Sequence, residues 1–241
     1  MILRVLPLVT GLVPVLTVFT CYAIGIKTAG LPSCNPFLDG CTSVSSTGRH
    51  EPASYLFRAT MLPQTVLLAA YWLYNVGWLR ALGRARGLPP TGGSMAGVIG
   101  IAGAAFLILY VTFLGSELPF YEIMRRYGVY LYFALSVVAQ LILAYEVLPF
   151  ARAWPGGRFL LAARLQMLLA WIPFALGVLN LILKVVLEES RSAENRIEWT
   201  FAILMQVYFM LTYWSWRETG FSAAFTVERP GLPRSLRGRN G

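Results

Sequence analysis

Long apolar runs alternate with short polar segments along this chain. Six of the runs cover about residues 5–26, 59–79, 96–116, 128–149, 165–187 and 199–216. A helix needs roughly 20 apolar residues to cross the hydrocarbon core of a bilayer, and backbone groups in lipid must pair within a helix or a closed barrel. The runs are continuous rather than alternating, which disfavours a barrel. The pattern predicts an all-α, polytopic membrane protein with a bundle of six transmembrane helices.

The polar segments are too short for a soluble domain. We expect a single transmembrane domain over residues 1–216, with its longest connection at 27–58, followed by a tail at 217–241. The first run lacks a clean cleavage site and is longer than the apolar part of a signal peptide, so we interpret it as a retained span. The tail is rich in Gly, Pro and Arg, which predicts a basic, disordered segment that could rest on anionic lipid.

The distribution of charge orients the predicted bundle. Only 13% of the residues are charged, and the formal net charge is +9. With the amino terminus in the cytoplasm and six crossings, the whole positive excess falls on the cytoplasmic side, and the charges on the other side balance. Because basic residues mark cytoplasmic connections, we expect both termini to be cytoplasmic. The excess is therefore explained by topology, and nucleic acid is not expected as a partner.

Segment 27–58 is then an extracytoplasmic loop. It contains Cys34 and Cys41, and a disulfide can persist on that side of the membrane; the sequence leaves open whether they are bonded. The stretch "HEPASYLF" suggests that the second helix begins near Pro52, where a missing N–H costs nothing. The segment just before this helix, with Ser45, Ser46 and Arg49, could hold a phosphate.

Polar residues within or at the ends of the runs suggest either helix packing or function. Amides at Gln140, Asn180 and Gln206 can bridge helices as structural contacts. A second group lies at the outer ends of the predicted spans, where its members could meet the loop at one depth. This group consists of Glu117, Lys184 and Glu198.

Recognised catalytic motifs are missing. There is no nucleophile elbow, P-loop or HExxH helix. A histidine-based metal site is excluded because His50 is the only histidine, and no cofactor is expected. The weak catalytic candidates are His50, as a general base in the loop, and Glu198.

Three stretches carry a family resemblance. They are "SVSSTGRHEPASYLFR" with a following Tyr71-Trp72 pair, "IEW" at the start of the last run, and "LTYWSWRETGF" at its end. With six runs in this order, the chain resembles the Frag/DRAM/Sfk family and is most similar to its GPI-anchor lipid-remodelling branch. The loop pattern of that branch is matched by Cys34 or Cys41, Ser43, Ser45, Ser46, Gly48, Pro52 and Arg58, and its glutamate-aromatic pair by Glu198 and Trp199.

Two functions remain open. The resemblance implies a protein that handles lipids or lipid anchors. The first hypothesis is a protein that binds or organises lipid through an outer-leaflet pocket, formed by the loop and the outer helix ends. The alternative is an enzyme, or a subunit of one, that transfers or removes an acyl chain on a membrane lipid or GPI-like anchor. The candidate lipid-binding residues are Ser43, Ser45, Ser46, Arg49, Arg58, Glu117, Lys184 and Glu198.

Membrane lipids are the expected partners. Small residues at Gly97, Gly100 and Gly103 allow close helix approach, which would serve packing within the chain or a homo- or hetero-oligomer. The protein is expected to be an integral, multi-pass protein. Its compartment would be the plasma membrane in a bacterium, and the Golgi, the endoplasmic reticulum or another endomembrane in a eukaryote.

Overall fold

The computed structural model describes residues 2–87, 93–116, 118–186 and 191–222, and all regular structure within these ranges is helical. The all-α prediction is therefore confirmed. Of the predicted site residues, Glu117 lies outside the described residues, and the side chain of Lys184 is not described. The predicted tail also lies outside the described residues from residue 223 onward. The elements are a 3-10 helix Ile2–Val5, α1 Leu6–Thr28, α2 Val44–Thr47, α3 Ala53–Ala85, α4 Ser94–Thr112, α5 Pro119–Arg152, α6 Gly157–Val186 and α7 Arg191–Glu218.

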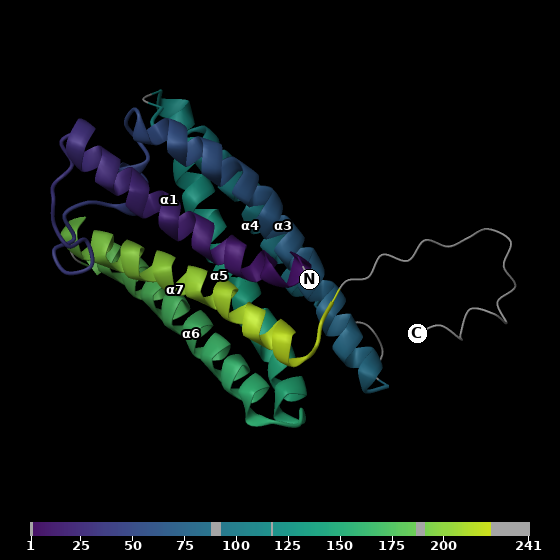
Figure 1. Cartoon of the computed structure of the whole chain (residues 1–241). Coiled ribbons are helices and arrows are strands. Elements are labelled where there is room, and N and C mark those ends of the chain that lie inside the picture. The colour runs from purple at the N-terminus through teal and green to yellow at the C-terminus, as the bar shows by residue number, and fades with distance from the viewer. Residues whose placement is uncertain (1, 88–92, 117, 187–190, 223–241) are drawn as a thin grey trace, which may run out of the picture.

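The six long helices of the described chain form a closed ring. Each packs beside the helix that follows it in the sequence, and α7 packs against α1 to close the ring. Figure 1 shows α1, α7 and α6 side by side along one flank, with the loop between α1 and α3 at one end of the bundle. The short connections make sequence neighbours antiparallel. The loop therefore lies at the same end of the ring as the start of α7.

Four of these helices are long and apolar enough to cross a membrane by length and composition. They are α1, α4, α5 and α6, the last over Gly157–Asn180. The predicted spans 59–79 and 199–216 lie within α3 and α7, which are long enough but carry more polar residues. The six-span count and the cytoplasmic location of both termini thus stay predictions.

The lower hydropathy of α3 and α7 has a structural cause. Polar side chains of these two helices bond to each other inside the ring rather than facing lipid. The hydroxyls of Tyr71 and Thr212 are 2.8 Å apart, and the Trp216 indole N–H donates to the Asn75 Oδ1 atom at 3.3 Å. In an apolar interior such groups must find partners. These bonds tie α3 to α7 across the bundle.

Small residues of α4 allow close packing within the chain. A Cβ atom on Gly97 would lie 2.5 Å from the Val76 side chain, and one on Gly100 would lie 2.2 Å from the Trp72 ring, both on α3. A Cβ atom on Gly103 would lie 3.2 Å from the Ser136 hydroxyl of α5. These glycines therefore serve close packing within the chain, and an oligomer through this helix stays a prediction.

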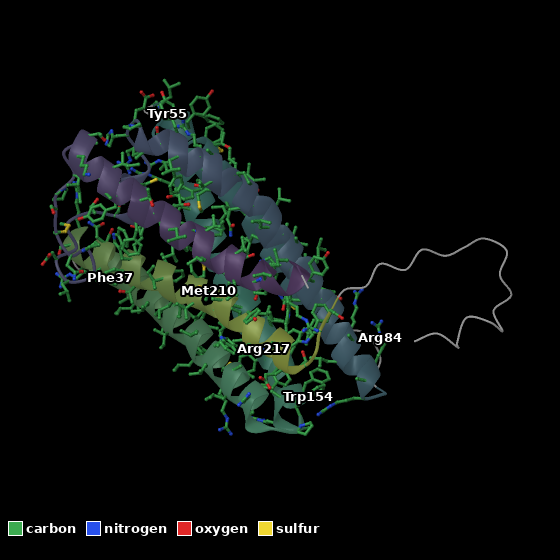
Figure 2. The ribbon with its side chains drawn as sticks, in the orientation of Figure 1. Phe37, Tyr55, Arg84, Trp154, Met210 and Arg217 are labelled. Atoms are coloured by element: carbon green, nitrogen blue, oxygen red, sulfur yellow. A yellow bond between two sulfur atoms is a disulfide. The ribbon has the colours of Figure 1, made fainter. Side chains whose placement is uncertain are left out.

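Both described ends of the chain meet at one end of the bundle. The Arg4 Nε atom donates to the Phe221 carbonyl at 3.0 Å, which joins the start of α1 to the residues after α7. Figure 2 shows Phe37 and Tyr55 at the end that carries the loop, with Arg84 and Arg217 toward the opposite end. The two ends are called the loop end and the terminal end below.

Candidate functional site

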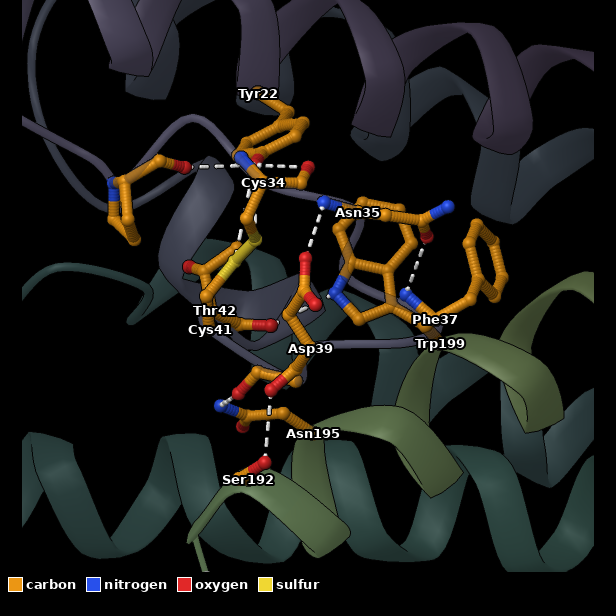
Figure 3. Close-up of a disulfide and its surroundings, with 12 residues drawn as sticks. Tyr22, Cys34, Asn35, Phe37, Asp39, Cys41, Thr42, Ser192, Asn195 and Trp199 are labelled. Carbon is orange, nitrogen blue, oxygen red and sulfur yellow. Dashed lines mark hydrogen bonds between the residues drawn. A yellow bond between two sulfur atoms is a disulfide. The ribbon is translucent and has the colours of Figure 1, made fainter.

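The disulfide between Cys34 and Cys41 closes the first part of the loop. The Tyr22 hydroxyl of α1 donates to the Pro32 carbonyl at 2.7 Å and accepts from the Cys34 N–H at 3.2 Å. Asn35 and Asp39 close a turn inside the ring of the disulfide, where the Asn35 N–H donates to the carboxylate of Asp39 at 2.9 Å. This half of the loop is thus held to the end of α1 (Figure 3).

The first turns of α7 hold the second part of the loop. The Trp199 indole N–H donates to the Thr42 carbonyl at 2.9 Å, and the Asn195 amide donates to the Gly40 carbonyl at 2.8 Å (Figure 3). Gly40 has a φ of +61°, and a Cβ atom there would lie 2.0 Å from the Ser192 carbonyl oxygen. Only glycine allows the loop backbone to approach α7 so closely.

Trp199 is the centre of this contact. Its side chain is fully buried, and its ring centroid lies 5.5 to 5.9 Å from those of Phe19, Tyr22 and Phe37. Aromatic edges and faces at such distances add to the gain from burial. The glutamate-aromatic pair that carries part of the family resemblance therefore includes the residue that anchors the loop.

The one-turn helix α2 positions the loop serines. Ser43 is its N-cap, and its hydroxyl oxygen accepts from the Ser46 N–H at 3.1 Å, as expected of serine in this position. The hydroxyls of Ser43 and Ser46 are also 2.7 Å apart. These two candidates are thus engaged with each other, while Ser45 is buried and directed toward the bundle.

The buried residues Ser45 and Tyr110 and the half-buried Glu198 form a polar cluster, which we call the carboxylate cluster. The Glu198 Oε1 atom accepts from the Ser45 backbone N–H at 3.2 Å and from its hydroxyl at 3.3 Å. The Tyr110 hydroxyl of α4 donates to the Ser45 hydroxyl oxygen at 3.3 Å. Three elements far apart in sequence therefore meet at one point at the loop end.

Three arginines lie at the same end of the bundle as this cluster. The guanidiniums of Arg49 and Arg125 act electrostatically on the Tyr110 hydroxyl and on each other. Arg58 donates through its Nη2 atom to the Leu114 carbonyl at 2.5 Å. The Nε atoms of Arg49 and Arg58 are buried, and neither has a hydrogen-bond partner among the described residues. Buried donors without partners are rare in proteins, so these two mark a place where an acceptor is expected.

A narrow apolar cavity of about 40 Å³ lies next to the carboxylate cluster, toward the middle of the bundle. Gln206 is one of its few polar residues; its side chain is 5% exposed, and its Oε1 atom has no partner among the described residues. The cavity is large enough for a few atoms of an alkyl chain, and a whole acyl chain would need the helices to separate. Its lining consists of Pro14, Val15, Val18, Val44, Phe57, Met61, Tyr110, Tyr132, Phe133, Trp199, Ala202, Ile203 and Gln206.

The structure brings together only part of the predicted set. Ser45 and Glu198 are in direct contact, and Arg58 reaches the same end of α4 through Leu114, four residues from Tyr110. His50 is exposed and makes no side-chain hydrogen bond with another described residue. No serine–histidine pair is therefore formed by the described residues, and they hold no group of three or more potential metal ligands.

Tyr110, Arg125 and Gln206 belong to the site but were not among the predicted binding residues. Tyr110 lies inside an apolar run with no distinguishing motif, and Arg125 carries one of several charges beside the fourth run. Gln206 was singled out only as a polar residue within its span. The position of all three at the site follows from the ring order of the helices, which the sequence alone does not specify.

Comparisons with known proteins give one match. The family model described as the Frag1/DRAM/Sfk1/Cwh43P N-terminal domain matches residues 2–219, which include every helix described above. No curated protein matches the chain, and no solved structure matches it.

Proposed function

This chain belongs to the Frag1/DRAM/Sfk1/Cwh43P family, and on that premise we propose that it binds or organises membrane lipid at its loop end. One observation carries the proposal: the carboxylate cluster adjoins an apolar cavity, and the same end of the bundle holds two buried arginine Nε atoms without a partner among the described residues. Val44, Tyr110 and Trp199 line the cavity, and Ser45 and Glu198 are the sequence neighbours of two of them. Polar residues beside an apolar cavity suit a lipid, which has a polar headgroup and apolar acyl chains.

The headgroup is expected to be a phosphodiester. Arg49 and Arg58 each offer a buried, unpaired Nε donor, and arginine binds phosphate through charge-assisted hydrogen bonds. The Glu198 carboxylate accepts the N–H and O–H of Ser45, so it holds the loop in place beside the arginines. The first carbons of an acyl chain would then enter the cavity.

The leaflet follows from the predicted topology. The uneven distribution of arginine predicts that the loop lies outside the cytoplasm. The contact between Arg4 and Phe221 is compatible with this topology, because both described ends of the chain lie at the terminal end. The lipid would therefore come from the outer leaflet.

Native mass spectrometry of the purified protein tests the proposal. We would compare a phosphatidylethanolamine with the diacylglycerol that has the same chains but lacks the phosphate. The Arg49→Gln/Arg58→Gln variant should weaken phospholipid binding more than about tenfold, because two hydrogen bonds to a charged group are lost, and should leave diacylglycerol binding unchanged. Arg126→Gln is the control, since Arg126 is exposed at the same end and pairs with Glu122 at 2.7 Å. Equal binding by all three proteins would refute the proposal.

A second candidate function is acyl transfer or removal on a membrane lipid or GPI-like anchor. The observation that favours it is the 3.3 Å contact between the Ser45 hydroxyl and the Glu198 carboxylate, which is within reach of proton transfer. Lipid profiling of a deletion strain complemented with Ser45→Ala or Glu198→Gln separates the two functions. An enzyme requires that both variants fail to restore the acyl composition, whereas a lipid organiser leaves that composition unchanged in the deletion strain itself.

A further inference from the structure

A second and larger groove lies between α6 and α7 at the terminal end. Its volume is about 290 Å³, well above that of the cavity at the loop end. Glu198 and Arg217 are nineteen residues apart on α7, so the groove lies roughly 28 Å along the helix from the carboxylate cluster. Its lining includes Arg158, Leu161, Leu165, Trp214, Arg217 and Glu218.

The groove changes from charged to apolar along its length. Arg158 lies in the first turn of α6 and Arg217 in the last turn of α7, so both guanidiniums are at the terminal end of the bundle. Leu161 and Leu165 follow one and two turns deeper, and they are 58% and 40% exposed. Large apolar side chains with such exposure are expected to meet lipid or a ligand.

The two arginines are available for an anion. Neither Arg158 nor Arg217 forms an ion pair with another described residue, although the groove also contains Glu218. The Arg217 guanidinium lies 5.5 Å from the centroid of the Trp214 ring. This cation–π contact favours a position of the guanidinium at the rim of the groove. With two positive charges and one negative charge, the rim has a net positive charge.

We propose that this groove binds an anionic phospholipid of the leaflet at the terminal end, which is the cytoplasmic leaflet in the predicted topology. The phosphate would lie between Arg158 and Arg217, and one acyl chain would lie along Leu161 and Leu165. Basic pockets between membrane helices are suited to acidic headgroups. The order of arginine and leucine along the groove matches the order of headgroup and chain in a phospholipid, whereas a free phosphate would use only its charged end.

The test is a native mass-spectrometry titration of the full chain with phosphatidylglycerol and with phosphatidylcholine of the same acyl chains. The wild type should prefer phosphatidylglycerol, and Arg158→Gln/Arg217→Gln should lower its apparent affinity by about tenfold or more. The matched control is Arg84→Gln/Arg152→Gln, which removes two exposed arginines at the terminal end but outside the groove. An equal loss in both double variants would mean a general surface charge effect and would overturn the proposal.

Two further arms identify the ligand and the site. Leu165→Trp fills the apolar part of the groove while keeping both arginines, so it should also weaken phosphatidylglycerol binding. Glycerol phosphate, which has no acyl chain, should not compete with the bound lipid. Competition by glycerol phosphate together with unchanged binding by Leu165→Trp would indicate a phosphate site and refute a lipid site. Substitutions of Arg49 and Arg58 should leave phosphatidylglycerol binding in the groove unchanged, because neither residue lines it.

Discussion

Trp199→Phe should loosen the loop without unfolding the bundle. The indole N–H is the one hydrogen-bond donor of the Trp199 side chain, and it donates to the Thr42 carbonyl at 2.9 Å. The Trp199 side chain is fully buried. Phenylalanine keeps an aromatic ring beside Phe19, Tyr22 and Phe37 but provides no donor. The substitution therefore isolates the hydrogen bond from most of the aromatic packing.

The expected cost is about 1–3 kcal/mol, which is the penalty for a buried acceptor that loses its partner. The loop keeps its other hydrogen bonds to α7, from Ser192 and Asn195 near the surface and to Glu198 at Ser45, so the loss should appear as local opening of the loop around Thr42. At 25 °C that free energy corresponds to an increase in the open population by a factor of about 5 to 150.

Amide hydrogen exchange in a detergent micelle measures this opening directly. Peptides that cover residues 35–47 should exchange faster in the variant by the stated factor, while peptides from the middle of α3 and α5 should be unchanged. Trp171→Phe is the matched control, because Trp171 is 42% exposed on α6 and its indole N–H makes no hydrogen bond with another described residue. Unchanged exchange in the loop of Trp199→Phe would refute the view that this indole anchors the loop.

Three other perturbations test separate features. Gly100→Ala should lower the thermal midpoint and the free energy of unfolding by about 1–3 kcal/mol, because the new Cβ would lie 2.2 Å from the Trp72 ring. Gly77→Ala is the control, and it should be neutral or stabilising because a Cβ there has no neighbour within 4 Å. Reduction of the loop disulfide should speed proteolysis of the loop, and a rate equal to that of the oxidised protein would contradict its role in holding the loop. The cysteine of His50→Cys should react with an impermeant thiol reagent in intact cells. Reaction only after permeabilisation would show that the loop faces the cytoplasm and that the predicted topology is wrong.

The apolar pattern was sufficient to predict the helices because a bilayer imposes length and polarity on any segment that crosses it. Each predicted run lies largely within one long helix, and the helix expected near Pro52 begins at Ala53. The pattern was less informative for α3 and α7. Residues such as Asn75 and Thr212 make these runs more polar, and only the tertiary structure shows that they face the interior.

The candidate site was predicted in part. Ser45 and Glu198 were selected as residues of one site, and they are in contact although 153 positions separate them. His50 was also a candidate, but its exposed side chain takes no part in the cluster. Ser43 caps the helix α2 by accepting from the Ser46 N–H, a role that the local sequence suggests, and the lipid-binding role of both serines stays a prediction.

The sequence by itself determined that this is an all-helical chain with long apolar segments, a polar loop with two cysteines, and a family assignment that covers most of its length. Those features depend on local composition and on residues close together along the chain. The tertiary structure decided which helices are neighbours, because ring order depends on how side chains from distant segments fit. The meeting of Ser45, Tyr110 and Glu198, and the groove between α6 and α7, follow from that packing and have no signature in any single stretch of sequence.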